Sequence, residues 1–148
     1  VTVICMNNGL YGMTGGQVAP TTLDRAITST TPYGNIEDAF DLCRLAQTSG
    51  ASYVARWTTA HPRQTTKAIK KAILKKGASF IEVLSQCPVH KKETPVDMIR
   101  ALKAMTVPLK KAEGSSKIPV GVFCDTPRPE WTEKYDTIIE KASREAHA

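Results

Sequence analysis

Short apolar runs that end at turn-forming residues recur along the chain, and they have the length of buried β-strands. The first run is followed by a polar, glycine-rich stretch, residues 7–35, that shows no clear period. We expect strands over residues 1–6, 51–57, 78–84 and 119–124.

Between these runs, apolar positions recur at the spacing of one helical face. Ile36 and Phe40, for example, share a face with Cys43. We expect helices from an N-cap at Asn35 to Gly50, over 63–76, from the Thr94-Pro95 pair onward, and from about Glu130. The alternation of strands and helices predicts one α/β domain with a mostly parallel sheet and flanking helices.

Composition narrows the class of protein. The chain has 148 residues, 41% of them hydrophobic, which suits a single folded domain. No apolar run approaches the ~18–20 residues that a membrane span needs. The net charge of +6 gathers on the helix expected over 63–76, where lysines alternate with apolar positions, as on a solvated helix face above a buried one. Those lysines are Lys67, Lys70, Lys71, Lys75 and Lys76.

That charge pattern predicts neither a nucleic-acid nor a membrane partner, because no nucleic-acid motif or interleaved aromatic residues accompany the lysines. The basic face can still meet an acidic partner or an anionic substrate. The four cysteines include no CxxC pair, so we expect no self-contained zinc or iron–sulfur site and a reducing cytoplasm as the compartment. Cys5, Cys43 and Cys124 lie in apolar segments and are expected in the core.

The glycine-rich segment 7–17 directly follows the first strand. In parallel α/β sheets, ligands bind beyond the carboxyl ends of the strands. Glycines there let backbone N–H groups approach phosphate oxygens, and asparagine and main-chain oxygens are ligands that suit Mg²⁺. A magnesium–phosphate site, an active-site lid and a wide turn are all compatible with this segment. Neither of the common phosphate-binding motifs, GxxxxGK[ST] or GxGxxG, is present.

The segment VTVICMNNGLYGMTGGQVAPTT resembles the second half of the thiamine diphosphate motif in β subunits of 2-oxoacid:ferredoxin oxidoreductases. The form NNxxYGMTGGQ is typical of the 2-oxoglutarate branch of that family. The resemblance continues through TPYGNIEDAFDLCRLAQTSGASYVAR, KKGASFIEVLSQCPVH, IPVGVF and RPEWTEKY, so that it covers essentially the whole chain.

The resemblance implies a role for individual residues of the glycine-rich segment. Asn8 would bind Mg²⁺ through its side-chain oxygen, and Leu10 through its main-chain carbonyl. Gly12, Met13 and Thr14 would line the diphosphate and thiazolium side of thiamine diphosphate.

Cys87, which follows a strand and precedes Pro88, matches the cysteine that gives cluster-bearing members the fourth thiolate of a [4Fe–4S] cluster. The alternative is a buried cysteine at the end of a strand. His90 stands beside Lys91 and Lys92 and is expected at the surface; we assign none of these three residues a role.

The resemblance also indicates what the chain lacks. It contains no GDG signature, so the aspartate ligand of Mg²⁺ and most cluster ligands would precede Val1. The glutamate that activates the aminopyrimidine would come from a partner α subunit. Some relatives have a lysine near the substrate carboxylate where this chain has Gly15. We therefore expect the C-terminal half of a β subunit, with residues from about 109 to 148 as a C-terminal extension.

The reaction that the resemblance implies is oxidative decarboxylation of a 2-oxoacid, with 2-oxoglutarate as the expected substrate, to acyl-CoA and CO₂. Electrons would pass through the cluster to ferredoxin, and activity would require the α subunit, with γ and δ subunits as further partners. No residue of this chain is expected to act as a general acid or base. Two alternatives remain: a non-catalytic α/β interaction subunit, and a thiamine-dependent decarboxylase or synthase without electron transfer.

Overall fold

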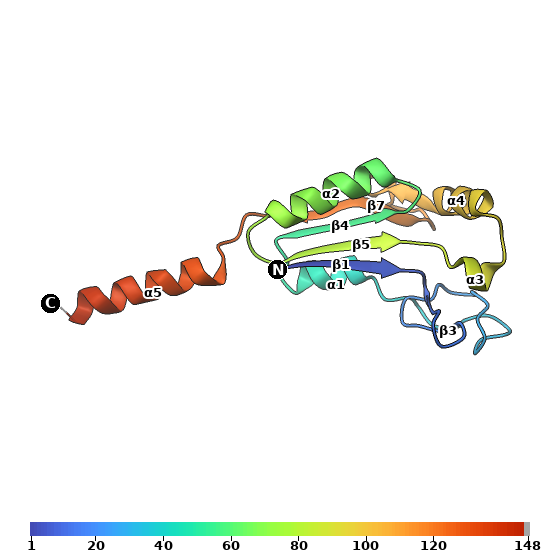
Figure 1. Cartoon of the computed structure of the whole chain (residues 1–148), viewed down its shortest axis with the longest axis horizontal. Helices are drawn as coiled ribbons and strands as arrows, with labels where there is room; N and C mark the ends of the chain where they lie inside the picture. The colour runs from blue at the N-terminus through green and yellow to red at the C-terminus, as the bar shows by residue number, and fades with distance from the viewer. Residues whose placement is uncertain (147–148) are drawn as a thin grey trace.

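The computed structural model describes residues 1–146 of the chain, the side chain of Lys91 excepted. A five-stranded sheet forms its centre (Figure 1). Across the sheet the strands follow the order β1 (Thr2–Asn7), β5 (Ser79–Leu84), β4 (Tyr53–Thr58), β7 (Ile118–Asp125) and β6 (Thr106–Pro108). Three of the four neighbouring pairs are parallel, and only β4 and β7 run antiparallel, which confirms the mostly parallel sheet.

The two faces of the sheet are covered by different helices (Figure 1). On one face, α2 (Pro62–Leu74) buries Ala68 and Ala72 against side chains of β4 and β5. On the other face, the shorter α1 (Leu42–Thr48) buries Cys43 against Val54. These two small clusters form the hydrophobic core on the two faces of the sheet. The parallel pairing of β1, β5 and β4 puts their carboxyl ends at one edge of the sheet.

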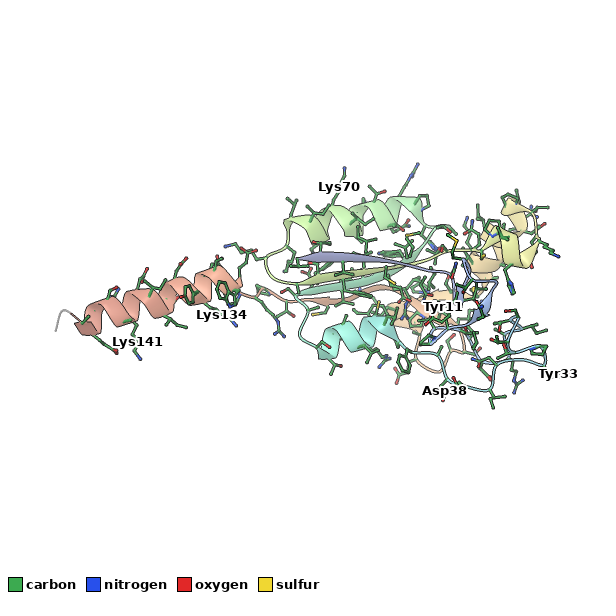
Figure 2. All side chains as sticks on the ribbon, turned by 60° about the horizontal axis from the view of Figure 1, so that its bottom comes forward. Tyr11, Tyr33, Asp38, Lys70, Lys134 and Lys141 are labelled. Atoms are coloured by element: carbon green, nitrogen blue, oxygen red, sulfur yellow. The ribbon has the colours of Figure 1, made fainter. Side chains whose placement is uncertain are left out.

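The lysine face of α2 points to solvent as expected, and Figure 2 shows Lys70 directed away from the sheet. Three of these lysines are nonetheless paired: Lys71 and Lys75 both bind the carboxylate of Asp125 on β7, and Lys76 binds Glu133. The apolar face of the helix is narrower than the pattern predicts, because Ile73 is exposed rather than buried.

The predicted helix from Asn35 is wrong over its first half, since α1 begins only at Leu42. Asp41 caps it, accepting a hydrogen bond from the Arg44 amide at 3.1 Å. Asn35 is buried and uses its side-chain N–H₂ to hold the carbonyls of Thr22, Leu23 and Glu37 in an irregular loop. These bonds give the backbone an alternative to the helix. The side chains of Ile36 and Phe40 are exposed instead of lining a helical face.

The helix α4 (Pro95–Ala104) is confirmed, with Thr94 as its N-cap and Met98 and Leu102 buried. The structure adds short elements that the hydrophobic pattern does not predict. They are the hairpin of β2 (Leu10–Tyr11) and β3 (Gln17–Val18), the helix α3 (Pro88–Lys91), the strand β6 and a 3₁₀ turn at Leu109–Lys111.

The last helix, α5 (Trp131–Ala146), begins where the sequence predicts and projects away from the sheet (Figure 1). None of its residues up to Ala146 is buried, and Trp131 and Ile138 are largely exposed. An ion pair between Lys76 and Glu133 links its first turn to the end of α2. By contrast β7, which also falls after residue 109, is a strand of the central sheet. The boundary of a C-terminal extension near residue 109 therefore stays a prediction. No helix within residues 1–146 combines the length and apolarity needed to cross a bilayer.

Candidate functional site

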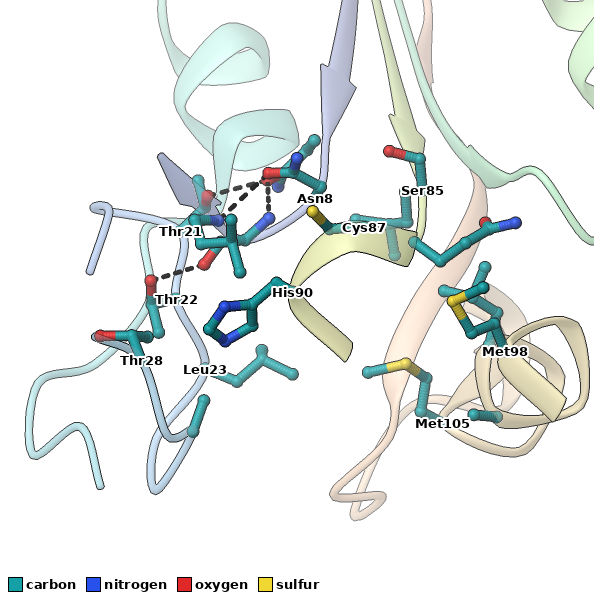
Figure 3. A pocket seen from close by; sticks show the side chains of 18 of the residues that line it. Asn8, Thr21, Thr22, Leu23, Thr28, Ser85, Cys87, His90, Met98 and Met105 are labelled. Atoms are coloured by element: carbon teal, nitrogen blue, oxygen red, sulfur yellow. Dashed lines mark hydrogen bonds between the residues drawn. The ribbon is translucent and has the colours of Figure 1, made fainter. Parts of the chain in front are cut away.

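A cavity of about 170 Å³ opens at the carboxyl ends of β1 and β5 (Figure 3). The loop after β1 and the segment after β5 form two of its walls, and Met98 and Met105 close it on the side of α4. No aspartate, glutamate, lysine or arginine lines it. The place agrees with the rule that ligands of parallel sheets bind beyond the strand ends.

The first part of the glycine-rich loop is held from both sides. The N–H of Gly9 donates to the side-chain oxygen of Asn7 at 2.9 Å, and the Gly9 carbonyl accepts from the hydroxyl of Thr22 at 2.6 Å. Gly9 has a φ of +73°, a conformation that favours glycine. Asn8 is exposed, and its side-chain oxygen accepts from the Leu10 amide at 3.2 Å. Asn8 and Leu10 therefore flank a fixed peptide.

The second part of the loop forms the tip of the β2–β3 hairpin. Gly12, Met13 and Thr14 all lie there, exposed. Met13 makes no contact that hides it from solvent, and its exposed fraction is 100%. The hydroxyl of Thr14 is occupied by a hydrogen bond to Gln17 at 2.6 Å. The tip is therefore a surface that a ligand or a second polypeptide can cover.

Cys87 lies against this loop although it belongs to the segment after β5. A Cβ placed on Gly12 would lie 3.8 Å from Sγ of Cys87 and 3.5 Å from Nδ2 of Asn8. The fold therefore brings together Asn8, Leu10, Gly12 and Cys87, whereas Met13 and Thr14 remain at the tip. Cys87 is partly buried and forms no disulfide. Among the described residues, no group of three histidine, cysteine or acidic side chains is arranged to hold a metal ion.

His90 is partly buried, between the surface position that the sequence predicts and the core. The helix α3 places its ring inside the cavity wall, where Figure 3 shows it facing the loop. Nε2 of His90 lies 3.4 Å from the carbonyl of Ile27, and a Cβ on Gly16 would come within 2.6 Å of Nδ1. Lys92 ends α3 in a left-handed conformation and is exposed. A single histidine in a basic stretch carries no sequence signal for this contact.

Sequence reasoning also missed a buried charged cluster beside the site. Nε of Arg56 donates to Glu82 at 2.6 Å, and the side chains are 5% and 2% exposed. Burial by itself would lower the pKa of Arg56, but the Glu82 carboxylate raises it above its usual value. Burial raises the pKa of Cys43 far above that of an exposed thiol, although Arg56 opposes the shift. Cys43 therefore remains a thiol that donates to Glu82.

The donor chemistry of the cavity fits a magnesium-held diphosphate in part. Asn8 and the backbone of the loop offer neutral oxygen ligands and N–H groups, which suit Mg²⁺ and phosphate. A Cβ at Gly12 would fill the space between Asn8 and Cys87. No carboxylate among the lining residues would complete the metal's coordination, so that ligand would have to come from other polypeptide.

Comparison with known proteins decides the family. The family model described as thiamine pyrophosphate enzyme, C-terminal TPP binding domain, matches residues 1–83. The chain belongs to this family of thiamine pyrophosphate enzymes. The cavity-lining residues from Asn7 to Thr28 lie within the matched range, and those from Leu84 to Ile118 follow it.

Two relatives of this TPP binding domain, which match nearly the whole chain, carry the same name. The chain is 50% identical to the 2-oxoglutarate synthase subunit KorB of Methanocaldococcus jannaschii, over 98% of the chain and 58% of that protein. It is 46% identical to KorB of Methanothermobacter thermautotrophicus, over 99% of the chain and 55% of that protein. These relatives confirm the resemblance to 2-oxoacid:ferredoxin oxidoreductase subunits and its 2-oxoglutarate branch.

The fold is likewise shared with a solved structure. The 2-oxoglutarate:ferredoxin oxidoreductase from Magnetococcus marinus, with 2-oxoglutarate, coenzyme A and succinyl-CoA bound, matches with a TM-score of 0.80 and 27% identity. The match covers 96% of this chain and 53% of that one. The chain thus spans little more than half the length of the relatives that it matches.

Proposed function

We propose that this chain is part of the β subunit of a 2-oxoacid:ferredoxin oxidoreductase that acts on 2-oxoglutarate. The whole enzyme would decarboxylate the 2-oxoacid oxidatively, transfer the acyl group to coenzyme A and pass electrons through a [4Fe–4S] cluster to ferredoxin. The observation that carries the proposal is the contact between two segments: Cys87 lies against the glycine loop that contains Asn8 and Gly12. The KorB relatives support the choice of substrate.

In this proposal the loop anchors thiamine diphosphate through Mg²⁺. Bound thiamine diphosphate supplies a thiazolium that accepts the electron pair released with CO₂. Asn8 would offer its side-chain oxygen to the metal and Leu10 its main-chain carbonyl. Gly12, Met13 and Thr14 would line the cofactor, and the fixed peptide between the two metal ligands would keep them in place. This chain's contribution is positioning and electrostatics, because no general acid or base lines the cavity beyond His90.

Cys87 would give one thiolate to the cluster, with the other ligands supplied by polypeptide outside this chain. Its place at the start of α3, partly buried and without a disulfide, supports this role. Four unpaired cysteines favour a reducing cytoplasm as the compartment.

Partner subunits are required by the same proposal. No aspartate, glutamate, lysine or arginine lines the cavity, and Gly15 offers no lysine for a substrate carboxylate. An α subunit, with γ and δ subunits where present, would therefore complete the pocket for the 2-oxoacid and coenzyme A. Ferredoxin would receive the electrons.

The test is to purify the complete complex and measure its bound thiamine diphosphate and its visible absorption after gel filtration. The proposal expects both the cofactor and the broad absorption of an iron–sulfur cluster. A complex without cofactor would refute it in favour of a non-catalytic interaction subunit. Retained cofactor without cluster absorption would instead identify a thiamine-dependent decarboxylase or synthase without electron transfer.

A further inference from the structure

The buried pair of Arg56 and Glu82 joins two neighbouring strands. The residues stand directly opposite each other on the parallel strands β4 and β5, on the face that α1 covers. Arg56 also donates from Nη2 to Asp41, the N-cap of α1, at 2.5 Å. The thiol of Cys43 donates to the same Glu82 oxygen, Oε2, that accepts from Arg56. One carboxylate oxygen of Glu82 is thus fully engaged by the core.

The other oxygen of Glu82 faces the glycine loop. Oε1 accepts a hydrogen bond from Nδ2 of Asn7 at 2.7 Å, across 75 positions of sequence. Asn7 is the last residue of β1, and its own side-chain oxygen accepts from the Gly9 amide and from the Thr21 hydroxyl, at 2.9 and 2.8 Å. The carboxylate therefore decides which way the Asn7 amide points.

The orientation of Asn7 matters because Gly9 lies between the two proposed metal ligands. With its oxygen toward Gly9, Asn7 satisfies the Gly9 N–H; turned over, it would present N–H₂ to that N–H and leave it without an acceptor. A buried ion pair is a weak source of fold stability, since its desolvation costs much of what the attraction provides. The position of this pair is better explained by the hydrogen bond from Asn7 to Oε1, the Glu82 oxygen that Arg56 does not bind.

We propose that Glu82 is a positioning residue of the cofactor site, acting through Asn7 on the Gly9 peptide and so on Asn8 and Leu10. The inference rests on the proposed function, because it takes Asn8 and Leu10 as the Mg²⁺ ligands. The hydrogen-bond chain itself, from Arg56 through Glu82 and Asn7 to Gly9, does not depend on that function.

Glu82→Gln tests the inference with almost no change of shape. A carboxylate can accept from Arg56 and Asn7 at once, whereas a glutamine has one acceptor oxygen and one N–H₂ group. If that oxygen faces Arg56, its N–H₂ meets the N–H₂ of Asn7. If it faces Asn7, the donor of Arg56 is opposed by another donor. The charged donor of Arg56 makes the stronger hydrogen bond, so we expect the oxygen to face Arg56 and the chain to break at Asn7.

Asp41→Asn is the matched control. It removes a negative charge from the same cluster, and asparagine remains a good N-cap for α1. It leaves the bond between Glu82 and Asn7 untouched. A merely structural role of the cluster would affect both variants alike.

The experiment measures two quantities on the complete complex. The first is the dissociation constant of thiamine diphosphate at fixed Mg²⁺. The second, on complex stripped of cofactor with a chelator, is hydrogen–deuterium exchange of the loop amides, Gly9 above all. We expect Glu82→Gln to weaken cofactor binding roughly tenfold, the effect of losing one hydrogen bond of about 1.4 kcal/mol, and to speed Gly9 exchange. Asp41→Asn should change neither by more than about twofold, because it breaks no bond in the chain to Gly9.

Asn7→Ala keeps the proposal testable if Glu82→Gln fails to fold. It leaves the ion pair in place and removes the acceptor of Gly9, so that it should reproduce both effects. Equal cofactor binding by the Glu82 and Asp41 variants, or unchanged Gly9 exchange in Asn7→Ala, would overturn the inference. If the wild-type complex binds no thiamine diphosphate, the proposed function is contradicted. The exchange measurement still tests the hydrogen-bond chain to Gly9 in that case, because it is made without cofactor.

Discussion

Replacing Gly16 by alanine should deform the cavity wall. Gly16 is buried and has a φ of +81°, and the added Cβ would lie 2.6 Å from Nδ1 and 3.1 Å from Cε1 of His90. Two costs add: about 1–2 kcal/mol for a side chain in a left-handed conformation, and about 1–3 kcal/mol for overpacking. We expect Gly16→Ala to lower the free energy of unfolding by roughly 2–5 kcal/mol.

The two costs can be separated with matched variants. Gly114 has a similar φ of +70°, with nothing within 4 Å of an added Cβ, so Gly114→Ala should show only the conformational cost. The double variant Gly16→Ala/His90→Ala should recover the steric part and approach the loss of Gly114→Ala. Denaturant unfolding followed by circular dichroism measures each value. Equal midpoints for Gly16→Ala and Gly114→Ala would refute the close packing of His90 under the loop.

Three further predictions concern the site and the basic helix. Asn8→Ala should abolish Mg²⁺-dependent binding of thiamine diphosphate, measured by calorimetry on the complex, while the thermal unfolding midpoint stays unchanged; full affinity would contradict the ligand role. Cys87→Ser should bleach the visible absorption of the cluster, and Cys124→Ser, a control far from the loop, should not. Hydrogen bonds from Lys71 and Lys75 lower the pKa of Asp125 below its usual value near 3.8. Its contribution to stability is therefore present above about pH 4 and lost as the pH falls through the lowered pKa, so Asp125→Asn should be less stable than wild type at pH 6 and equal to it in strong acid.

Most of the predicted elements are confirmed and one helix is wrong over its first half, and this difference has a physical reason. The strands β1, β4, β5 and β7 and the starts of α2, α4 and α5 depend on local periodicity and on turn residues, and the sequence predicts them to within about two residues. The helix from Asn35 fails because the side chain of Asn35 finds three carbonyls of its own loop, a set of long-range and local bonds that periodicity does not encode.

The candidate site shows the same division. The glycine loop could be identified from its residues and its position after a strand, and the resemblance to a family named Asn8, Leu10 and Cys87. His90 and the bond from Glu82 to Asn7 could not be found in this way. His90 contacts the loop after β1 from the segment after β5, and Glu82 on β5 bonds to Asn7 on β1. A lone histidine or glutamate has no sequence pattern that would indicate either contact.

What the sequence determined by itself is the set of elements and the chemistry of the loop, because hydrophobic period, caps and glycines act over a few neighbouring residues. The tertiary structure decided which strand ends meet. The parallel register of β1 and β5 sets Cys5 opposite Glu82 and Asn7 opposite Leu84, which brings the Glu82 carboxylate to Asn7 and the segments that carry Gly12 and Cys87 to the same edge of the sheet. Strand order and register follow from the burial of whole faces against α1 and α2, and such burial is a property of the assembled sheet rather than of any one segment.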